Sequence, residues 1–220
     1  AVAATYTATM TGVYSVIATN TVGCSGTSLT TTVTVNPVPV ATVTLSGPLT
    51  FCNGDSVTFS VSTGTGYTYQ WQLGGVPIFG ETNSTYVAHG AGTIGVVVTN
   101  SFGCTATSPL SVVTVNPSPV VILATSGSPG FCSGGSFSMS IPLVANTDYQ
   151  WYNGTTPIGG ATNAAYTATA SGTYKVIAVN TINGCTAASP TTTVTVMGTP
   201  IITPISSTSF CWGGNSMLSI

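Results

Sequence analysis

The stretch "SVTFSVSTGTGYTYQWQLGGVPI", residues 56–78, decides the fold because it returns as "SFSMSIPLVANTDYQWYNGTTPI" at residues 136–158. Before the shared Tyr-Gln-Trp triplet, apolar residues alternate with Ser and Thr, as at Val57, Phe59 and Val61. A period of two is typical of half-buried antiparallel strands. We therefore expect the 220-residue chain to be all-β and built from repeats of about 80 residues.

Two further signals give the organisation of the repeats. Phe-Cys recurs at residues 51–52, 131–132 and 210–211, and Gly-Cys recurs at 23–24, 103–104 and 184–185. The segments "NPVPV" (36–40) and "NPSPV" (116–120) mark boundaries because Pro cannot continue a strand ladder. The sequence predicts the C-terminal half of a repeat at 1–37, complete repeats at 38–117 and 118–198, and the N-terminal part of a further repeat at 199–220.

Both ends of the sequence are thus expected to fall inside a repeat. A segment of a longer array has this property, and so does a subunit that completes its broken repeats by exchanging strands with neighbouring copies.

Charge is nearly absent from the chain, which holds one Lys, three acidic residues and one His, for a net charge of -2. No basic patch is available to neutralise phosphates, so nucleic acid is not expected as a partner. No apolar run approaches the roughly 20 residues that span a bilayer, so membrane insertion is not expected either.

Several motifs resemble those of an immunoglobulin-like domain. "GDSVTFSV" (54–61) resembles its strand B, and "SGTYKVIAVNTING" (171–184) resembles its strand F with the tyrosine corner. The resemblance implies tandem two-sheet β-sandwiches whose core signature consists of Trp71, Trp151, Tyr14 and Tyr174. The chain departs from the family where core cysteines are usual, with Val61 and Ile141 on strand B and valines on strand F, and Ile94 replaces the corner tyrosine of the middle repeat.

More narrowly, the pattern "FCxG…YQW…GTY…NGC…S…VTVNP.P" resembles the Ig-like repeats of large secreted adhesins of Bacteroidota. That resemblance implies an extracellular or cell-surface location. "DSV" at residues 55–57 also resembles the O-glycosylation signature of these bacteria, which makes Ser56 a candidate glycosylation site.

Six cysteines without a CxxC or Cys/His cluster predict disulfides in an oxidising compartment: Cys24, Cys52, Cys104, Cys132, Cys185 and Cys211. Two connectivities are open. Pairing within repeats joins Cys52 to Cys104 and Cys132 to Cys185, whereas pairing across a junction joins Cys52 to Cys185. The immunoglobulin topology separates the first pair by about 25 Å, and a disulfide needs Cα atoms within about 7 Å.

The residues that could carry chemistry are few and scattered: Asp55, Glu81, Asp148, Lys175 and His89. Without a cluster of titratable side chains, no catalytic, cofactor-binding or metal-ligating residue is predicted, and the chain is not expected to be an enzyme.

The function predicted from these patterns is a non-enzymatic structural array, a segment of a bacterial surface adhesin or of a self-assembling extracellular filament. Its partners would be neighbouring repeats or copies of itself, because uncharged surfaces with many strand edges tend to associate. The alternative is an adhesin module that binds glycans or proteins through exposed aromatics, for which Tyr67, Phe79, Tyr152 and Trp212 are the candidates.

Overall fold

A computed structural model describes residues 4–201, 203–204, 212–213 and 218–219. All regular structure in these residues is β-strand. None of these residues belongs to a helix that could cross a membrane. The chain divides into two units, Ala1–Val115 and Asn116–Ile220. Each unit contains one complete repeat.

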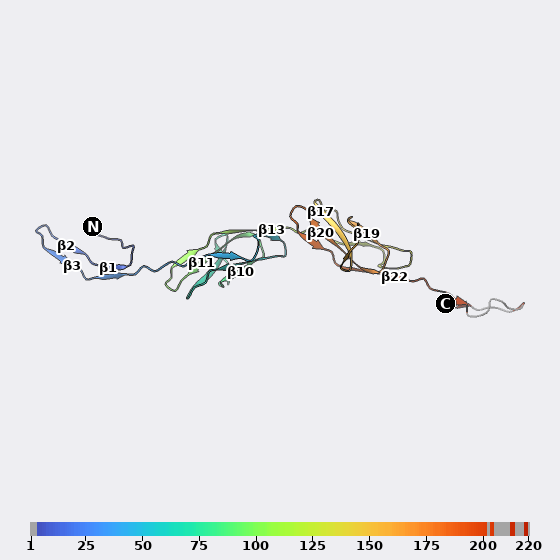
Figure 1. Ribbon diagram of the computed structural model, residues 1–220, viewed down its shortest axis with the longest axis horizontal. Helices are drawn as coiled ribbons and strands as arrows, with labels where there is room; N and C mark the ends of the chain where they lie inside the picture. Colours follow the sequence, from blue (N-terminus) through green and yellow to red (C-terminus); the bar gives the residue numbers. More distant parts are fainter. Residues whose placement is uncertain (1–3, 202, 205–211, 214–217, 220) are drawn as a thin grey trace. The chain divides into compact units, whose positions relative to one another are not determined.

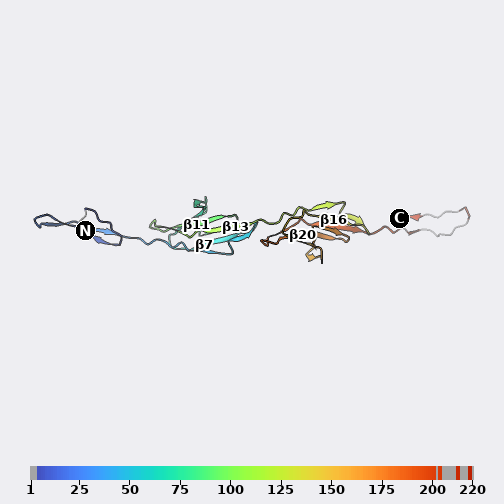
Figure 2. The ribbon, with the colours of Figure 1, turned by 90° about the horizontal axis from the view of Figure 1, so that it is seen from above.

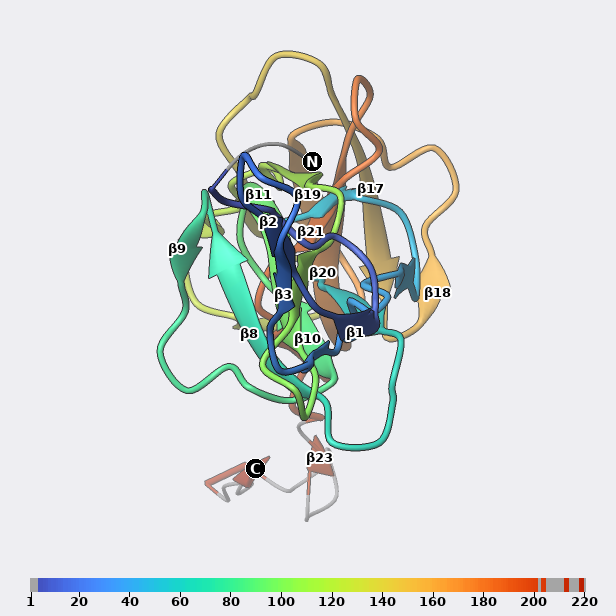
Figure 3. The same cartoon turned by 90° about the vertical axis from the view of Figure 1, so that its left-hand side faces the viewer.

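The complete repeat of the first unit is a sandwich of two sheets (Figure 1). One sheet has the order β10-β7-β5, and the other has the order β6-β13-β11-β8-β9, with β12 also paired to β11. Its strands are β5 (Val43–Leu45), β6 (Thr50–Cys52), β7 (Val57–Val61), β8 (Thr68–Leu73), β9 (Val76–Pro77), β10 (Thr85–Ala88), β11 (Gly92–Thr99), β12 (Thr105–Thr107) and β13 (Ser111–Asn116). Figure 3 shows β8 and β9 side by side.

The complete repeat of the second unit has the same topology, with sheet orders β14-β16-β19 and β15-β22-β20-β17-β18, and with β21 also paired to β20. Figure 2 shows β16 and β20 of this repeat from above. Its strands are β14 (Ala124–Ser126), β15 (Gly130–Cys132), β16 (Phe137–Ser140), β17 (Thr147–Asn153), β18 (Thr156–Pro157), β19 (Ala165–Ala168), β20 (Gly172–Asn180), β21 (Thr186–Ala188) and β22 (Thr192–Met197).

Alternating side chains of each strand form the core between the two sheets, as the period of two predicts. In β7, Val57 and Phe59 are each 1% exposed, and Thr58 between them is only partly buried. The tryptophans of β8 and β17, Trp71 and Trp151, are completely buried. Each indole Nε1 donates a 2.9 Å hydrogen bond to a backbone carbonyl, so the polar atom is satisfied inside the core. The predicted fold class, tandem immunoglobulin-like β-sandwiches, is confirmed.

The strand F tyrosines lie at the sequence-predicted corner positions. The Tyr174 hydroxyl, in a side chain only 2% exposed, donates a 2.9 Å hydrogen bond to the Ala170 carbonyl. The Tyr14 hydroxyl makes the same bond to Met10. Ile94 occupies this position in the middle repeat, where it is buried but has no hydroxyl to donate.

In the flanking segments, the described residues form short ladders. Near the N-terminus, β1 (Gly12–Tyr14) pairs with β4 (Thr31–Val33), and β2 (Ile17–Thr19) pairs with β3 (Ser25–Thr27). β1 and β2 together correspond to the continuous β11. Near the C-terminus, β23 (Thr203–Pro204) pairs with β24 (Leu218–Ser219).

Candidate functional site

The titratable side chains are dispersed over the two units. Asp55 lies in the turn before β7, His89 is exposed after β10, and Asp148 is exposed in β17. Lys175, in β20, lies 5.7 Å from the centre of the Tyr152 ring opposite it, a cation–π contact. In the described part of the chain, no three His, Cys, Asp or Glu residues gather closely enough to hold a metal ion.

Two core tyrosines have altered acidity. Burial raises the pKa of Tyr86, and the nearby Glu81 carboxylate raises it further. Burial also raises the pKa of Tyr174, with a smaller effect from Tyr166. Both tyrosines pack against other rings of the core: Tyr86 stacks on Trp71 at a ring-centroid distance of 5.6 Å, and Tyr174 lies 5.7 Å from the Tyr166 ring.

The turn after strand F positions one set of cysteines. In the middle repeat, the Asn100 side-chain oxygen accepts hydrogen bonds from the backbone N–H of Phe102 (3.1 Å) and of Cys104 (3.0 Å). Gly103 adopts a φ of 80°, which glycine reaches without strain. Asn20 holds Cys24 in the same way, and Asn180 holds the corresponding turn before Cys185.

The turn after strand F also contacts the Pro-rich segment that comes just before the repeat to which the turn belongs. The Asn100 amide donates a 2.7 Å hydrogen bond to the Pro37 carbonyl, and the Cys104 sulfur lies 3.9 Å from the Asn36 carbonyl oxygen. In the second repeat, the Asn183 amide donates a 3.4 Å hydrogen bond to the Pro117 carbonyl. The turn after strand F is therefore located at the end of the repeat where the chain enters.

The turn before strand B positions the other set of cysteines. Cys52 ends β6, and its carbonyl accepts a 3.0 Å hydrogen bond from the Asp55 N–H. Cys132 ends β15, and its carbonyl accepts a 2.9 Å hydrogen bond from the Gly135 N–H. The two complete repeats thus carry the same pair of cysteine turns.

The chemical states of the cysteines differ between these equivalent positions. Cys52 and Cys185 are disulfide-bonded, whereas Cys24, Cys104 and Cys132 are free thiols. Cys211 lies outside the described residues. Pairing within repeats is therefore wrong, because it needs both Cys104 and Cys132. The pairing of Cys52 with Cys185 stays a prediction.

The topology of a single repeat explains why pairing within it fails. In the second repeat, β15 runs parallel to β22, while β20 runs antiparallel to β22. Cys132, at the end of β15, and Cys185, after the end of β20, therefore lie at opposite ends of the sandwich. Six residues of β22 correspond to about 20 Å, and the Cα atoms of a disulfide lie within about 7 Å.

A buried serine that was not predicted from the sequence, Ser189, supplies hydrogen bonds between β21 and β22, where the chain leaves the sheet. The Ser189 Oγ accepts a 3.0 Å hydrogen bond from the Val176 N–H and donates a 2.9 Å bond to the Pro190 carbonyl. Ser108 makes the same pair of bonds with Val96 and Pro109. The signal was present in the sequence, because Ser28, Ser108 and Ser189 recur with the repeat.

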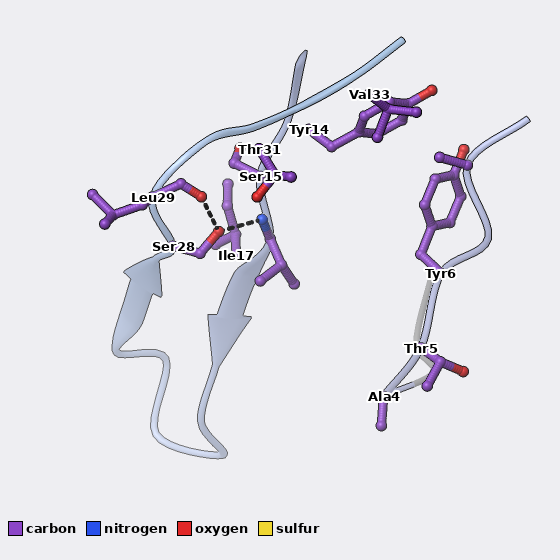
Figure 4. Close-up of a pocket in the computed structure, with 12 residues that line it drawn as sticks. Ala4, Thr5, Tyr6, Tyr14, Ser15, Ile17, Ser28, Leu29, Thr31 and Val33 are labelled. Atoms are coloured by element: carbon purple, nitrogen blue, oxygen red, sulfur yellow. Dashed lines mark hydrogen bonds between the residues drawn. The ribbon is translucent and has the colours of Figure 1, made fainter. Parts of the chain in front are cut away.

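The N-terminal half-repeat exposes a face that is buried in the complete repeats. Val16 is 64% exposed, whereas its equivalents Val96 and Val176 are completely buried. A pocket in this face is lined by Tyr6, Tyr14 and ten further residues (Figure 4). Figure 4 also shows the Ser28 hydroxyl, which bonds to the Val16 N–H and the Leu29 carbonyl as its buried equivalents do.

The aromatic candidates for ligand binding do not share an environment. Phe79 and Trp212 are fully exposed, while Tyr67 and Tyr152 are half-buried. Phe79 is replaced by Gly159 in the second repeat. Ser56 is exposed immediately before β7, and its glycosylation stays a prediction.

No protein-family model matches the chain, and no curated protein matches it. Its structure is similar to three N-terminal domains of the highly immunogenic outer capsid protein (Hoc) of bacteriophage RB49, with a TM-score of 0.36 and 17% identity over 71% of this chain and 58% of that one. It is also similar to fibronectin(III)-like modules of Clostridium thermocellum CbhA (TM-score 0.35, 16% identity, 71% of this chain and 94% of that one). A third similar structure is that of extracellular domains 3–5 of Drosophila OTK (TM-score 0.39, 13% identity, 85% and 71%).

Proposed function

We propose that this chain is a non-enzymatic segment of a secreted structural array, in which immunoglobulin-like repeats set the reach and stiffness of a surface adhesin or extracellular filament. One observation carries the proposal: Cys52 and Cys185, which belong to successive repeats of the sequence, are disulfide-bonded, while Cys24, Cys104 and Cys132 are free. The pairing predicted from the sequence, Cys52 with Cys185, would restrain the relative motion of successive repeats.

The contacts within each repeat support the same function. The turn after strand F is hydrogen-bonded to the Pro-rich segment through which the chain enters the repeat. The donor is the Asn100 amide in one repeat and the Asn183 amide in the next. Proline limits the backbone freedom of that segment. A segment that is both proline-restricted and hydrogen-bonded bends less than a free linker.

An extracellular location belongs to this proposal. Protein disulfides persist in oxidising compartments, and the bonded state of Cys52 and Cys185 suits such a compartment. The near absence of charge also suits a chain whose surfaces are covered by neighbours or by glycans, for example at Ser56.

Electron microscopy of the oxidised full chain tests the proposal, with the reduced and alkylated chain as its control. We expect linear particles whose stiffness falls when the disulfide is reduced. Particles that are equally flexible before and after reduction contradict a structural array of this kind.

A second candidate function is glycan binding, and the full exposure of Phe79 favours it, because exposed aromatic rings stack on sugars. A glycan array probed with the parent chain and with Phe79→Ala tests it. Binding that the substitution abolishes supports this function, and no binding by the parent chain eliminates it.

A further inference from the structure

Three asparagines of the chain are followed directly by glycine: Asn53, Asn153 and Asn183. Such a pair undergoes a spontaneous reaction in which the backbone nitrogen of the glycine attacks the side-chain amide of the asparagine. Glycine favours the reaction because it has no side chain to obstruct its nitrogen and because it restricts φ least. The reacting pair is the same at all three positions, so the folded structure decides which of them reacts.

The reaction requires two groups to be available. The glycine N–H has to lose its proton before its nitrogen attacks, and the asparagine side chain has to rotate until its Cγ atom approaches that nitrogen. A hydrogen bond made by either group has to break first, and breaking it costs free energy. Pairs whose two groups are both hydrogen-bonded are therefore protected.

Asn153, in the second repeat, has both groups restrained. The Gly154 N–H donates a 2.7 Å hydrogen bond to the Thr173 carbonyl. The Asn153 Oδ1 accepts a 3.1 Å hydrogen bond from the Thr173 N–H. The same side chain packs against Gly172, in the space that a Cβ atom would take. This asparagine is held in place by the ladder between β17 and β20.

Asn183, in the turn after β20, is restrained in the same two ways. The Gly184 N–H donates a 2.8 Å hydrogen bond to the Asn180 carbonyl. The Asn183 Oδ1 accepts a 2.9 Å hydrogen bond from the Cys185 N–H, and its amide donates one of 3.4 Å to the Pro117 carbonyl. This pair is therefore protected as well.

Asn53 differs from the other two asparagines. It lies with Gly54 in the exposed turn after β6, where the closing 3.0 Å hydrogen bond joins the Asp55 N–H to the Cys52 carbonyl. In the described part of the chain, the Asn53 side chain and the Gly54 N–H make no hydrogen bond. Gly54 has a φ of 101°, and no atom lies within 4 Å of the position that a Cβ atom would take there. The turn leaves both groups available.

We propose that Asn53 is a modification site at which the complete repeat of the first unit acquires an isoaspartate. The Gly54 nitrogen loses its proton and bonds to the Asn53 Cγ, the Cγ–Nδ2 bond breaks, and ammonia leaves, which forms a five-membered imide. Water then adds to one of the two imide carbonyls and opens the ring. One product is aspartate, and the other is isoaspartate, in which the backbone runs through the former side chain.

The modification is specific to one of the two complete repeats and alters the turn that carries Cys52. In the equivalent turn of the second repeat, Ser133 precedes Gly134, and serine has no amide to react. The product adds a carboxylate two residues from Asp55, in a chain that has only three acidic residues. The isoaspartate also lengthens the backbone between Cys52 and Asp55, whose hydrogen bond closes the turn. The inference does not depend on the proposed function.

The test is incubation of the folded full chain in mildly alkaline buffer made with ¹⁸O-labelled water. Peptic peptides are then analysed by mass spectrometry, and isoaspartate is identified by methylation with a protein isoaspartate methyltransferase. Label in the new carboxyl group shows that the reaction took place during the incubation. We expect Asn53 to convert about tenfold or more faster than Asn153 and Asn183, because at least two hydrogen bonds have to break at each of those sites.

Two controls separate the effect of the fold from that of the local sequence. In urea, with the cysteines reduced and alkylated, the three asparagines are expected to convert at similar rates. Asn53→Ser copies the residue of the second repeat and is expected to remove the rapid methylation. Similar rates at the three sites of the folded chain, or an Asn53 that stays an amide while the unfolded chain reacts, overturn the inference.

Discussion

Replacing Ser189 with Ala removes a hydroxyl that completes two backbone hydrogen bonds inside the second repeat. The Val176 N–H, in a residue that is completely buried, loses its 3.0 Å acceptor, and the Pro190 carbonyl loses its 2.9 Å donor. Ser189 is only 6% exposed, so water does not take the place of the hydroxyl. An unsatisfied buried group costs about 1–3 kcal/mol of unfolding free energy.

For a domain of this size, that loss corresponds to a midpoint temperature lower by roughly 5–20 °C. Urea and thermal unfolding of the full chain, followed by tryptophan fluorescence, measure the effect. Hydrogen exchange at the Val176 amide assigns it to strand β20. Ser189→Thr keeps the hydroxyl and is expected to retain more of the stability than Ser189→Ala.

Ser28→Ala is the matched control, because Ser28 makes the same two bonds on an exposed surface. Water replaces its hydroxyl, so the change in unfolding free energy is expected to stay within about 0.5 kcal/mol. Equal losses for Ser28→Ala and Ser189→Ala would refute the reasoning that burial makes this hydroxyl important.

Three further predictions concern the core and the cysteines. Tyr174→Phe removes the 2.9 Å bond to the Ala170 carbonyl and is expected to cost about 0.5–1.5 kcal/mol in urea unfolding, with a change near zero arguing that the corner bond is unimportant. The pKa values of Tyr86 and Tyr174 are raised in the folded state, so the stability that this shift contributes is complete below pH 10.0 and is lost as pH rises through the folded pKa. The urea midpoint of the full chain should therefore fall in the alkaline range. For Tyr174→Phe, the same midpoint should fall less. Cys52→Ser is expected to lower the unfolding free energy by at most about 5 kcal/mol through loss of its disulfide, whereas the free-thiol variant Cys104→Ser should lose much less.

The strand pattern and the core were predictable because they depend on local alternation. Val57, Phe59 and Trp71 could be assigned to the core from their period and from the repeated Tyr-Gln-Trp triplet, and all three are buried. Successive side chains of a strand point to opposite faces of the sheet, so the alternation of apolar residues in a single sequence is sufficient to predict which of them are buried.

The cysteine states were harder to predict because equivalent residues differ. Cys52 and Cys132 occupy the same turn and have the same local sequence pattern, yet one is bonded and the other is free. Whether a cysteine is bonded depends on whether a second cysteine lies close to it in the folded protein, and the local sequence does not specify this. The strand directions place the two cysteine turns at opposite ends of a repeat, so the exclusion of pairing within a repeat was predictable from the topology.

The hydrogen bonds that Ser189 and Asn180 make to the backbone were not predicted, for another reason. Ser189 and Asn180 look like ordinary turn residues, and their roles depend on a strand interruption at Pro190 and on the path of the turn before Cys185. Their recurrence at each repeat was the available signal, since a residue kept at one position of every copy is tied to a shared backbone feature.

The decisive measurement is peptide mapping of the oxidised full chain under non-reducing conditions, with free thiols alkylated first. We expect one intramolecular peptide that joins Cys52 to Cys185, with Cys104 alkylated. A peptide that joins Cys52 to Cys104 would contradict it, because each repeat would then be closed on itself and no covalent restraint would act between successive repeats.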